Sequence, residues 1–353
     1  MSNATRNLDD VRRVHDDAIL VDGQGVTVLL PVAQVVPEAV GGVPYLDRAI
    51  AGGVTAQNVT LGIGGIGMGA DDFRALLGTM HGHYCYFEIE PRLVLVETAD
   101  DIRRAKREGR LGVIFGVQGL ASKIDDDPSL VRILHRLGLR IGQMTYNERN
   151  SLGCGCLEQP DSGLTQLGKI VVREMNHVGI AVDMAHAGDR TTLDAIDCSR
   201  EPVIVSHGNV RALCDTPRNY GDDALKALAG SGGVIGITAY GPLCETTPGM
   251  RPSLGDMIDH IAYATDLLGI EHVGIGSDFF ESESPVRFHA FFRVRYPEVF
   301  GDYTLENVYF DAFKRVEHFP LLTEALLARG FSGEDAVKIL GGNFLRVFDE
   351  VWS

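Results

Sequence analysis

Residues 179–186 read GIAVDMAH and residues 202–207 read PVIVSH, and a stretch of helical periodicity separates them. Each segment begins as a short run of β-branched and small apolar residues, which is typical of a strand buried on both faces. Each segment ends in a histidine, His186 in the first and His207 in the second. Two such units in succession favour parallel strands that are connected by helices.

The same alternation runs through the rest of the chain. Eight apolar runs are predicted as strands, at Ala18–Val21, Val54–Leu61, Gly112–Val117, Arg140–Thr145, Gly179–Met184, Pro202–Ser206, Gly233–Thr238 and His272–Ser277. A further run, Leu93–Val96, is interpreted as an inserted strand or the approach to a helix. Helices are predicted at Asp100–Glu108, Ser129–Gly138, Thr165–Val178, Arg190–Ile196 and Leu254–Leu268. Eight units of this kind favour an α/β fold of the (β/α)8 TIM-like barrel type over an open sheet.

A single barrel domain over residues 1–353 is the simplest account, because no linker divides the sequence. The aromatic, irregular stretch 279–319 is interpreted as a long excursion after the last strand, forming a lid, a pocket wall or a dimer contact. Helices are expected in the C-terminal part, 320–353, at Pro320–Arg329 and Ser332–Ile339. The glycine-rich segment 62–69 lacks the dinucleotide-binding fingerprint and is interpreted as backbone near the barrel mouth.

Composition excludes some classes of partner. The 353 residues carry a formal net charge of −16, with a pI near 5.1. Such a charge disfavours nucleic acid and anionic membrane surfaces as partners. Six scattered cysteines fit neither a zinc knuckle nor a disulfide scaffold, so reduced thiols in a cytoplasmic protein are expected. No apolar run reaches the length of a membrane span.

Three side chains at predicted strand ends suggest metal-assisted catalysis. Functional residues of such barrels lie at the carboxyl ends of the strands. His186 and His207 end neighbouring strands about 4.8 Å apart, so their imidazoles can converge on one metal ion. Asp278 ends the eighth strand, where it can act as a base toward metal-bound water and then as an acid toward the leaving amine. The alternatives are a structural, hydrogen-bonded histidine pair and an aspartate that caps the following segment.

Several strings, in a fixed order, resemble bacterial members of the membrane-dipeptidase (renal dipeptidase-like) family of zinc peptidases. They are GQMTYN at 142–147, DSGLT at 161–165, GIAVDMAH at 179–186, PVIVSH at 202–207, PRN at 217–219, HVGIGSD at 272–278 and LGGNFLRVF at 340–348. The resemblance implies a barrel of the metallo-dependent hydrolase type and a homodimer. It also implies two zinc ions, bridged by a glutamate and a hydroxide, that cleave dipeptides and related short amides.

Carried over position by position, the resemblance implies that His186 and His207 bind one zinc ion and that Asp278 is the catalytic acid/base. It implies that Arg218 holds the carboxylate of the substrate, a task suited to a planar bidentate donor. It places Tyr146, with Asn147 beside it, at a substrate-binding position. The alternative for the arginine is a surface residue paired with Asp215, Asp222 or Asp223.

The chain also departs from the family pattern at the other zinc ion. Gln24 and Val26 stand where the family has a histidine and an aspartate, and Gln118 stands where it has the bridging glutamate. Three of the five expected ligands are therefore replaced. A glutamine carries no charge and cannot bridge two cations as a carboxylate does, so at most one zinc ion is expected.

The sequence therefore favours an enzyme, a metal-dependent, dipeptidase-like hydrolase that cleaves a dipeptide or similar short amide by metal-activated water. One alternative is a repurposed barrel that binds a peptide-like metabolite for a non-hydrolytic step such as elimination or isomerisation. Another is a catalytically silent homologue that only binds such a molecule. The expected partner is in each case a small, peptide-like molecule.

Overall fold

A computed structural model describes residues 8–25, 43–61, 72–279, 281, 289 and 293–352. In these ranges nine parallel strands form one sheet in the order β2-β1-β9-β8-β7-β6-β5-β4-β3. Strand β2 also pairs with β4, which closes eight of the strands into a barrel. The predicted (β/α)8 barrel is confirmed.

The strands lie where the apolar runs predict them, with ends that differ by at most two residues. They are β1 (Leu20–Asp22), β2 (Val54–Leu61), β3 (Leu93–Leu95), β4 (Leu111–Val117), β5 (Leu139–Gln143), β6 (Ala181–Asp183), β7 (Ile204–Gly208), β8 (Val234–Ile237) and β9 (Val273–Ile275). The inserted run is β3, which pairs with the first three residues of β4 and stays outside the closed ring. The segment 62–69 lies outside the described residues.

Helices surround the barrel. They include α1 (Leu8–Asp17), α2 (Tyr45–Ala51), α3 (Phe73–Ile89), α4 (Ala99–Glu108), α5 (Leu120–Lys123), α6 (Ser129–Arg136), α7 (Gln166–Val178), α8 (Asp189–Cys198), α9 (Asp222–Gly230), α10 (Leu254–Leu268), α12 (Pro297–Phe300), α13 (Phe319–Arg329), α14 (Gly333–Val337) and α15 (Asn343–Val351). Helix α4 shows why the predictions hold, because Thr98 forms a capping box at its start and Gly109 ends it at φ 63°. No helix in the described ranges is long and apolar enough to cross a membrane.

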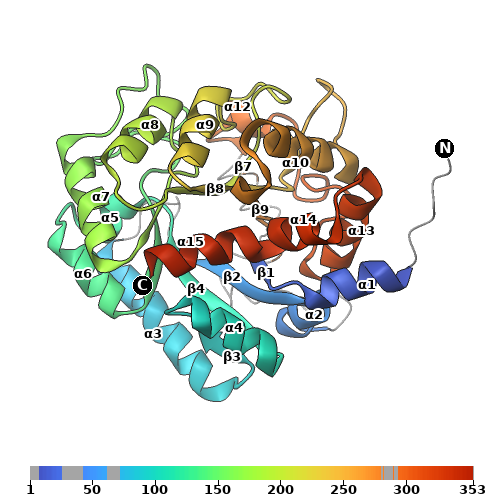
Figure 1. Ribbon diagram of the computed structural model, residues 1–353. Helices are drawn as coiled ribbons and strands as arrows, with labels where there is room; N and C mark the ends of the chain where they lie inside the picture. Colours follow the sequence, from blue (N-terminus) through green and yellow to red (C-terminus); the bar gives the residue numbers. More distant parts are fainter. Residues whose placement is uncertain are drawn as a thin grey trace.

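Helix α15 lies in the C-terminal part 320–353 that was predicted to be helical, although its own bounds were not predicted, and it closes the amino-terminal end of the barrel. Figure 1 shows it crossing in front of the strands. Its Phe344 and Phe348 are buried against inward-facing strand residues, among them Ala56 and Ile114. A Cβ atom added at Gly274 would lie 2.6 Å from the Phe344 ring, so the barrel has glycine where this ring enters. The apolar floor leaves the other end of the barrel for polar side chains.

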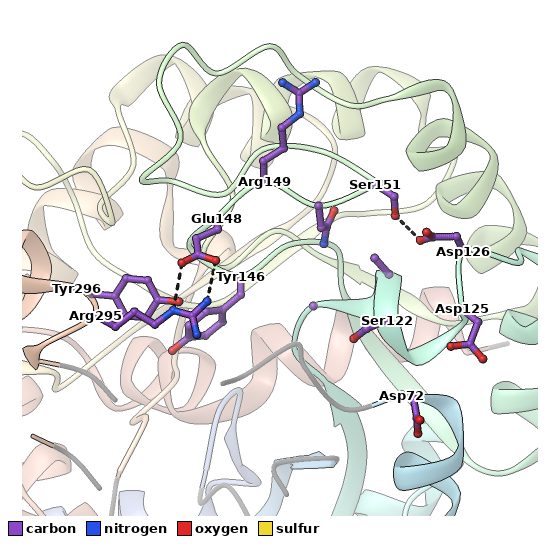
Figure 2. A pocket seen from close by; sticks show the side chains of 13 residues that line it. Asp72, Ser122, Asp125, Asp126, Tyr146, Glu148, Arg149, Ser151, Arg295 and Tyr296 are labelled. Carbon is purple, nitrogen blue, oxygen red and sulfur yellow. Dashed lines mark hydrogen bonds and ion pairs between the residues drawn. The ribbon is translucent and has the colours of Figure 1, made fainter. Parts of the chain in front are cut away.

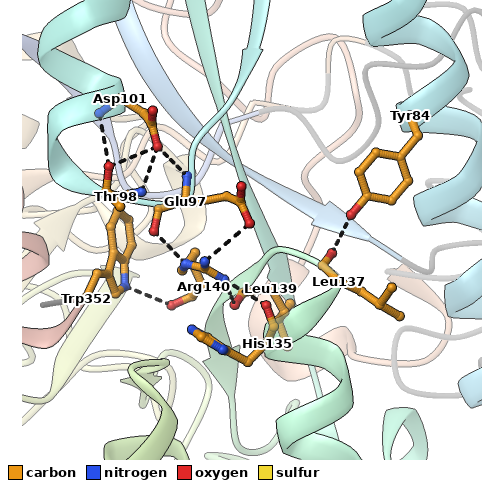
Figure 3. A network of polar contacts seen from close by, with 9 residues as sticks. All are labelled: Tyr84, Glu97, Thr98, Asp101, His135, Leu137, Leu139, Arg140 and Trp352. Carbon is orange, nitrogen blue, oxygen red and sulfur yellow. Dashed lines mark hydrogen bonds and ion pairs between the residues drawn. The ribbon is translucent and has the colours of Figure 1, made fainter.

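A buried arginine connects the same end of the barrel to the surrounding loops. Arg140 donates from Nε to the Glu97 carbonyl at 2.7 Å and from Nη1 to the His135 carbonyl at 3.0 Å. Trp352, just after α15, donates its indole N–H to the Arg140 carbonyl at 3.2 Å (Figure 3). Because this network lies at the amino end of β5, it stabilises the barrel and is remote from the candidate site.

Candidate functional site

Two histidines meet at the carboxyl ends of neighbouring strands. The Nε2 atom of His186, just after β6, lies 2.9 Å from the Nε2 atom of His207 in β7. Both side chains are buried. The sequence predicted this convergence from the strand positions alone.

The outer nitrogen of each ring has its own partner. His186 Nδ1 lies 2.6 Å from Asn147 Oδ1, and His207 Nδ1 lies 2.8 Å from Ser206 Oγ. Ser206 Oγ donates its proton to Asp183 Oδ2 at 2.6 Å, so it accepts from His207. Assigned from this network, each neutral ring carries its proton on Nδ1 and turns a lone pair toward the other ring. Two lone pairs this close attract a cation or a proton between them.

Burial, together with the nearby Arg218 guanidinium, lowers the pKa of both histidines well below the ordinary value. The rings are therefore neutral at pH 7, which is the form that binds a metal. His186 has a backbone φ of 65° and Asp278 one of 56°. Left-handed backbone is uncommon outside glycine. Two such residues in one site indicate that the surrounding structure fixes the orientation of both side chains.

Asp278 follows β9 and is fixed through its main chain. Its N–H donates to the Gln24 carbonyl at 2.7 Å. Its side chain keeps partial contact with solvent. Desolvation raises the pKa of Asp278 to about 7; the Arg218 guanidinium opposes this shift and the Asp22 carboxylate adds to it. Burial raises the pKa of Asp22 to about 7 as well, although Ser277 hydrogen bonds to it. A carboxyl group that titrates near neutrality suits acid/base work.

Arg218 is 3% exposed, which contradicts the alternative of a surface arginine. Its Nη2 donates to the His207 carbonyl at 3.1 Å. Its Nη1 is buried and has no hydrogen-bond partner among the described residues. A buried guanidinium with a free donor is expected to face an anion.

Five of the predicted residues line one small cavity of about 20 Å³. These are Tyr146, Asn147, His186, Arg218 and Asp278. Such a space holds about one water molecule. Apolar and aromatic side chains that sequence analysis did not single out complete its wall: Tyr240, Leu243, Val299 and Phe300. The last two belong to α12, within the excursion that follows the barrel.

A larger cavity of about 590 Å³ lies beside it, and Tyr146 lines both. Figure 2 shows Tyr146 below Glu148, whose carboxylate pairs with Arg295, while Arg149 points away. The Tyr146 ring also stacks on His186, with centroids 4.1 Å apart. The volume is in the range that small-molecule sites occupy. A dipeptide-sized molecule therefore has room next to the small cavity.

The described residues fit one metal ion better than two. Gln24 donates to Thr60 Oγ1 at 2.9 Å, so it is engaged inside the barrel. Gln118 is buried and neutral, and Val26 lies outside the described residues. Within the described ranges no group of three or more His, Cys, Asp or Glu side chains is placed to hold a metal. The two histidines, with their outer nitrogens engaged, fit a single ion as a pair of ligands, whereas the two-ion set does not fit.

Two supporting residues, Asp183 and Ser206, were missed in the sequence. Both stand in the quoted strings, Asp183 three residues before His186 and Ser206 directly before His207. A polar residue in an otherwise apolar strand is the signal that could have identified them. Side chains of this kind commonly orient histidine ligands.

Comparisons with known proteins identify related sequences. The model of the membrane dipeptidase family (peptidase family M19) matches residues 8–288. Dipeptidase verJ of Clonostachys rogersoniana is 33% identical over 264 residues, which cover 74% of this chain and 60% of that protein. Dipeptidase tcpJ of Claviceps purpurea is 31% identical over 262 residues, 74% of this chain and 56% of that protein. The chain thus spans little more than half the length of these curated relatives.

Solved structures show the same fold. An amidohydrolase from Pseudomonas aeruginosa superposes with a TM-score of 0.83 at 29% identity, covering 97% of this chain and 99% of that chain. A metallopeptidase from Rhodobacter sphaeroides, solved with a phosphinate mimic of the dipeptide L-Ala-D-Ala, superposes with a TM-score of 0.76 at 20% identity, covering 95% and 100%. At that identity the second likeness supports the fold alone.

Proposed function

The chain belongs to the membrane dipeptidase family, and from this premise we propose that it hydrolyses a dipeptide or a similar short amide that carries a free carboxylate. One observation carries the proposal: the buried Arg218, with its free Nη1, lines the same small cavity as Asp278 and His186. A carboxylate-binding cation, an acid/base and an imidazole thus meet around one space. The relatives named as dipeptidases support the same reaction.

The chemistry follows from these three groups. The Arg218 guanidinium binds the substrate carboxylate and so fixes the position of the amide bond. The Asp278 carboxylate takes a proton from the attacking water as the oxygen bonds to the amide carbon. Asp278 then gives this proton to the amide nitrogen as the C–N bond breaks, which releases an amine and a carboxylic acid. The pKa near 7 suits both roles.

We propose that the chain binds at most one zinc ion, with His186 and His207 as its protein ligands. When bound there, a zinc ion would supply Lewis-acid polarisation and lower the pKa of a bound water. Tyr146 stacks on His186 and lines both cavities, so we assign it to the substrate-binding wall together with Asn147.

A second candidate function is supported by the neutral side chains. Gln24 and Gln118 replace ligands that the resemblance implies, which favours a homologue that binds a peptide-like molecule without hydrolysing it or converts it by a non-hydrolytic step.

We also propose a single barrel domain and a cytoplasmic homodimer. The six free cysteines support the cytoplasmic assignment.

Amino-acid release from a panel of dipeptides tests the proposal. Wild-type protein, with and without added zinc, should release free amino acids from at least one dipeptide. Asp278→Asn should release none while keeping its affinity for that dipeptide. Binding without release by the wild type would favour the second candidate function.

A further inference from the structure

The polar residues at the mouth of the barrel fall into two halves. The strands β6 to β9 carry the histidines, Asp278 and their supports. The strands β1, β2, β4 and β5, with the residues that directly follow them, instead carry six neutral hydrogen-bonding side chains: Gln24, Asn58, Thr60, Gln118, Gln143 and Thr145. The buried carboxylate of Asp22, at the end of β1, is hydrogen-bonded to Ser277 of the other half. All six are at least nine-tenths buried. Polar residues at this end of such a barrel commonly belong to the ligand-binding site.

Backbone geometry places these six side chains on the inner face. Ile141, two residues before Gln143, belongs to the apolar floor inside the barrel. A Cβ at Gly142 would instead meet Met175 of the outer helix α7, so Gln143 points inward. Thr145 is two residues after Gln143, so its side chain points inward as well.

The neighbouring strands agree with this orientation. A Cβ at Gly116 would lie 2.1 Å from Asn58 Oδ1, so Gly116 and Asn58 share the inner face, and Gln118 comes two residues later. Gln24 joins them through its hydrogen bond to Thr60. The six side chains of the neutral half therefore form one layer on the inner face.

Much of this layer has no partner within the described residues. Both polar atoms of Gln143, the Gln118 Oε1, the Thr145 Oγ1 and the Asn58 Oδ1 are buried without a hydrogen bond. Protein interiors pair nearly all such atoms, because a buried polar atom without a partner destabilises the fold. Five unpaired atoms in one layer leave donors and acceptors that a bound molecule can satisfy.

We propose that this neutral half binds an uncharged hydrogen-bonding group on the acyl side of the ligand, a hydroxyl or an amide, in place of a free ammonium group. The inference rests on the proposed function, in which Arg218 binds the carboxylate at the other end. None of the six side chains carries a charge that could pair with an ammonium group. A buried cation without a counter-charge is unfavourable, whereas amides and hydroxyls both donate to and accept from a neutral group.

Three ligands that differ in one group test the inference. L-lactoyl-L-alanine, L-alanyl-L-alanine and N-propanoyl-L-alanine share the carboxylate and carry a hydroxyl, an ammonium or a hydrogen at the same carbon. Calorimetric titration of the wild-type protein should give lactoyl-alanine the highest affinity, by about tenfold over alanyl-alanine. Mass spectrometry of the solution in the calorimeter, taken after each titration, checks that the ligand has not been hydrolysed.

Two variants connect the preference to the layer. Thr145→Val is close to isosteric and removes a hydroxyl without a partner, so it should keep or raise the melting temperature. The variant should nevertheless bind lactoyl-alanine with roughly fivefold lower affinity, and its affinity for propanoyl-alanine should equal that of the wild type. Gln118→Glu adds a negative charge and should move the preference toward alanyl-alanine. The control is Gln166→Glu, the same substitution at an exposed position of α7.

The outcomes separate this inference from the proposed function. Alanyl-alanine that binds as tightly as lactoyl-alanine would overturn the inference alone, as would a preference that neither variant changes. If none of the three acids binds, both the inference and the proposed function are overturned. A preference for lactoyl-alanine that Thr145→Val removes supports the inference even if Gln118→Glu does not fold.

Discussion

The Nε2 atoms of His186 and His207 lie 2.9 Å apart, each on a ring whose Nδ1 has another partner. This arrangement predicts weak binding of a single zinc ion. Purified protein that is equilibrated with zinc should hold at most one ion per chain by elemental analysis. His207→Ala should lose this zinc, because one imidazole cannot hold the ion alone.

The control for this variant is His81→Ala, which changes an exposed histidine in α3. Its zinc content should equal that of the wild type. A wild-type protein that binds zinc and keeps it in His207→Ala would show that the ion lies elsewhere.

Restoring the family's ligands should change the metal count. The triple variant Gln24→His, Val26→Asp and Gln118→Glu reintroduces two carboxylates and an imidazole. Its zinc content should rise from one ion toward two per chain, and its hydrolysis of ordinary dipeptides should increase. An unchanged metal count would mean that the barrel mouth differs from the family at more than these positions.

Arg218→Lys separates carboxylate recognition from fold stability. Lysine keeps the charge but loses the bidentate geometry, so affinity for a dipeptide should fall by about 1–3 kcal/mol. The C-terminal amide of the same dipeptide should bind weakly to both proteins. Calorimetric titration with acid and amide pairs measures this, and Arg149→Lys, at an exposed arginine beside the larger cavity, is the control. Equal affinity of the wild type for acid and amide would refute a carboxylate-binding role.

The pKa of Asp278 predicts how activity depends on pH. The carboxylate must be ionised to accept a proton, so kcat/KM should rise as the pH increases and level off above about 7. Asp22 adds to this pKa and Arg218 opposes it. Asp22→Asn should therefore shift the rising limb to lower pH. If the rise of kcat/KM with pH is unchanged in Asp22→Asn, Asp22 does not influence the pKa of the acid/base.

The raised pKa of Asp278 also predicts how the free energy of unfolding depends on pH. Its folded pKa of about 7 exceeds the ordinary 3.8, so the folded protein binds more protons than the unfolded chain between these values. Its contribution to the free energy of unfolding therefore falls as the pH rises from 4 to 7. Asp278→Asn should gain stability relative to the wild type over that window, which urea denaturation at several pH values can check.

Most of the fold could be predicted because the barrel strands are short, apolar and separated by helical stretches. The (β/α)8 topology and the meeting of His186 with His207 follow from this periodicity. The start of α15 could not be predicted, because glycines 341 and 342 end a π-helical turn just before it. Of the two, Gly341 lies against β1.

The candidate site was predicted less completely than the fold. Arg218 could be singled out by resemblance, but its burial and its free Nη1 depend on the packing of distant segments. The neutral half of the barrel mouth was recognised only as missing ligands at Gln24 and Gln118. That Gln143 and Thr145 complete one layer with them depends on strand register, which sequence periodicity does not provide.

Hydrolysis in water enriched in 18O tests the central claim most directly. The account predicts that the wild-type protein, given a dipeptide that it binds, forms a carboxylic acid with one 18O atom from the solvent, as mass spectrometry detects. Asp278→Asn should form none. Recovery of a bound dipeptide without the label, or its conversion to an unlabelled product, would contradict hydrolysis and leave the chain a binding protein or an enzyme of another class.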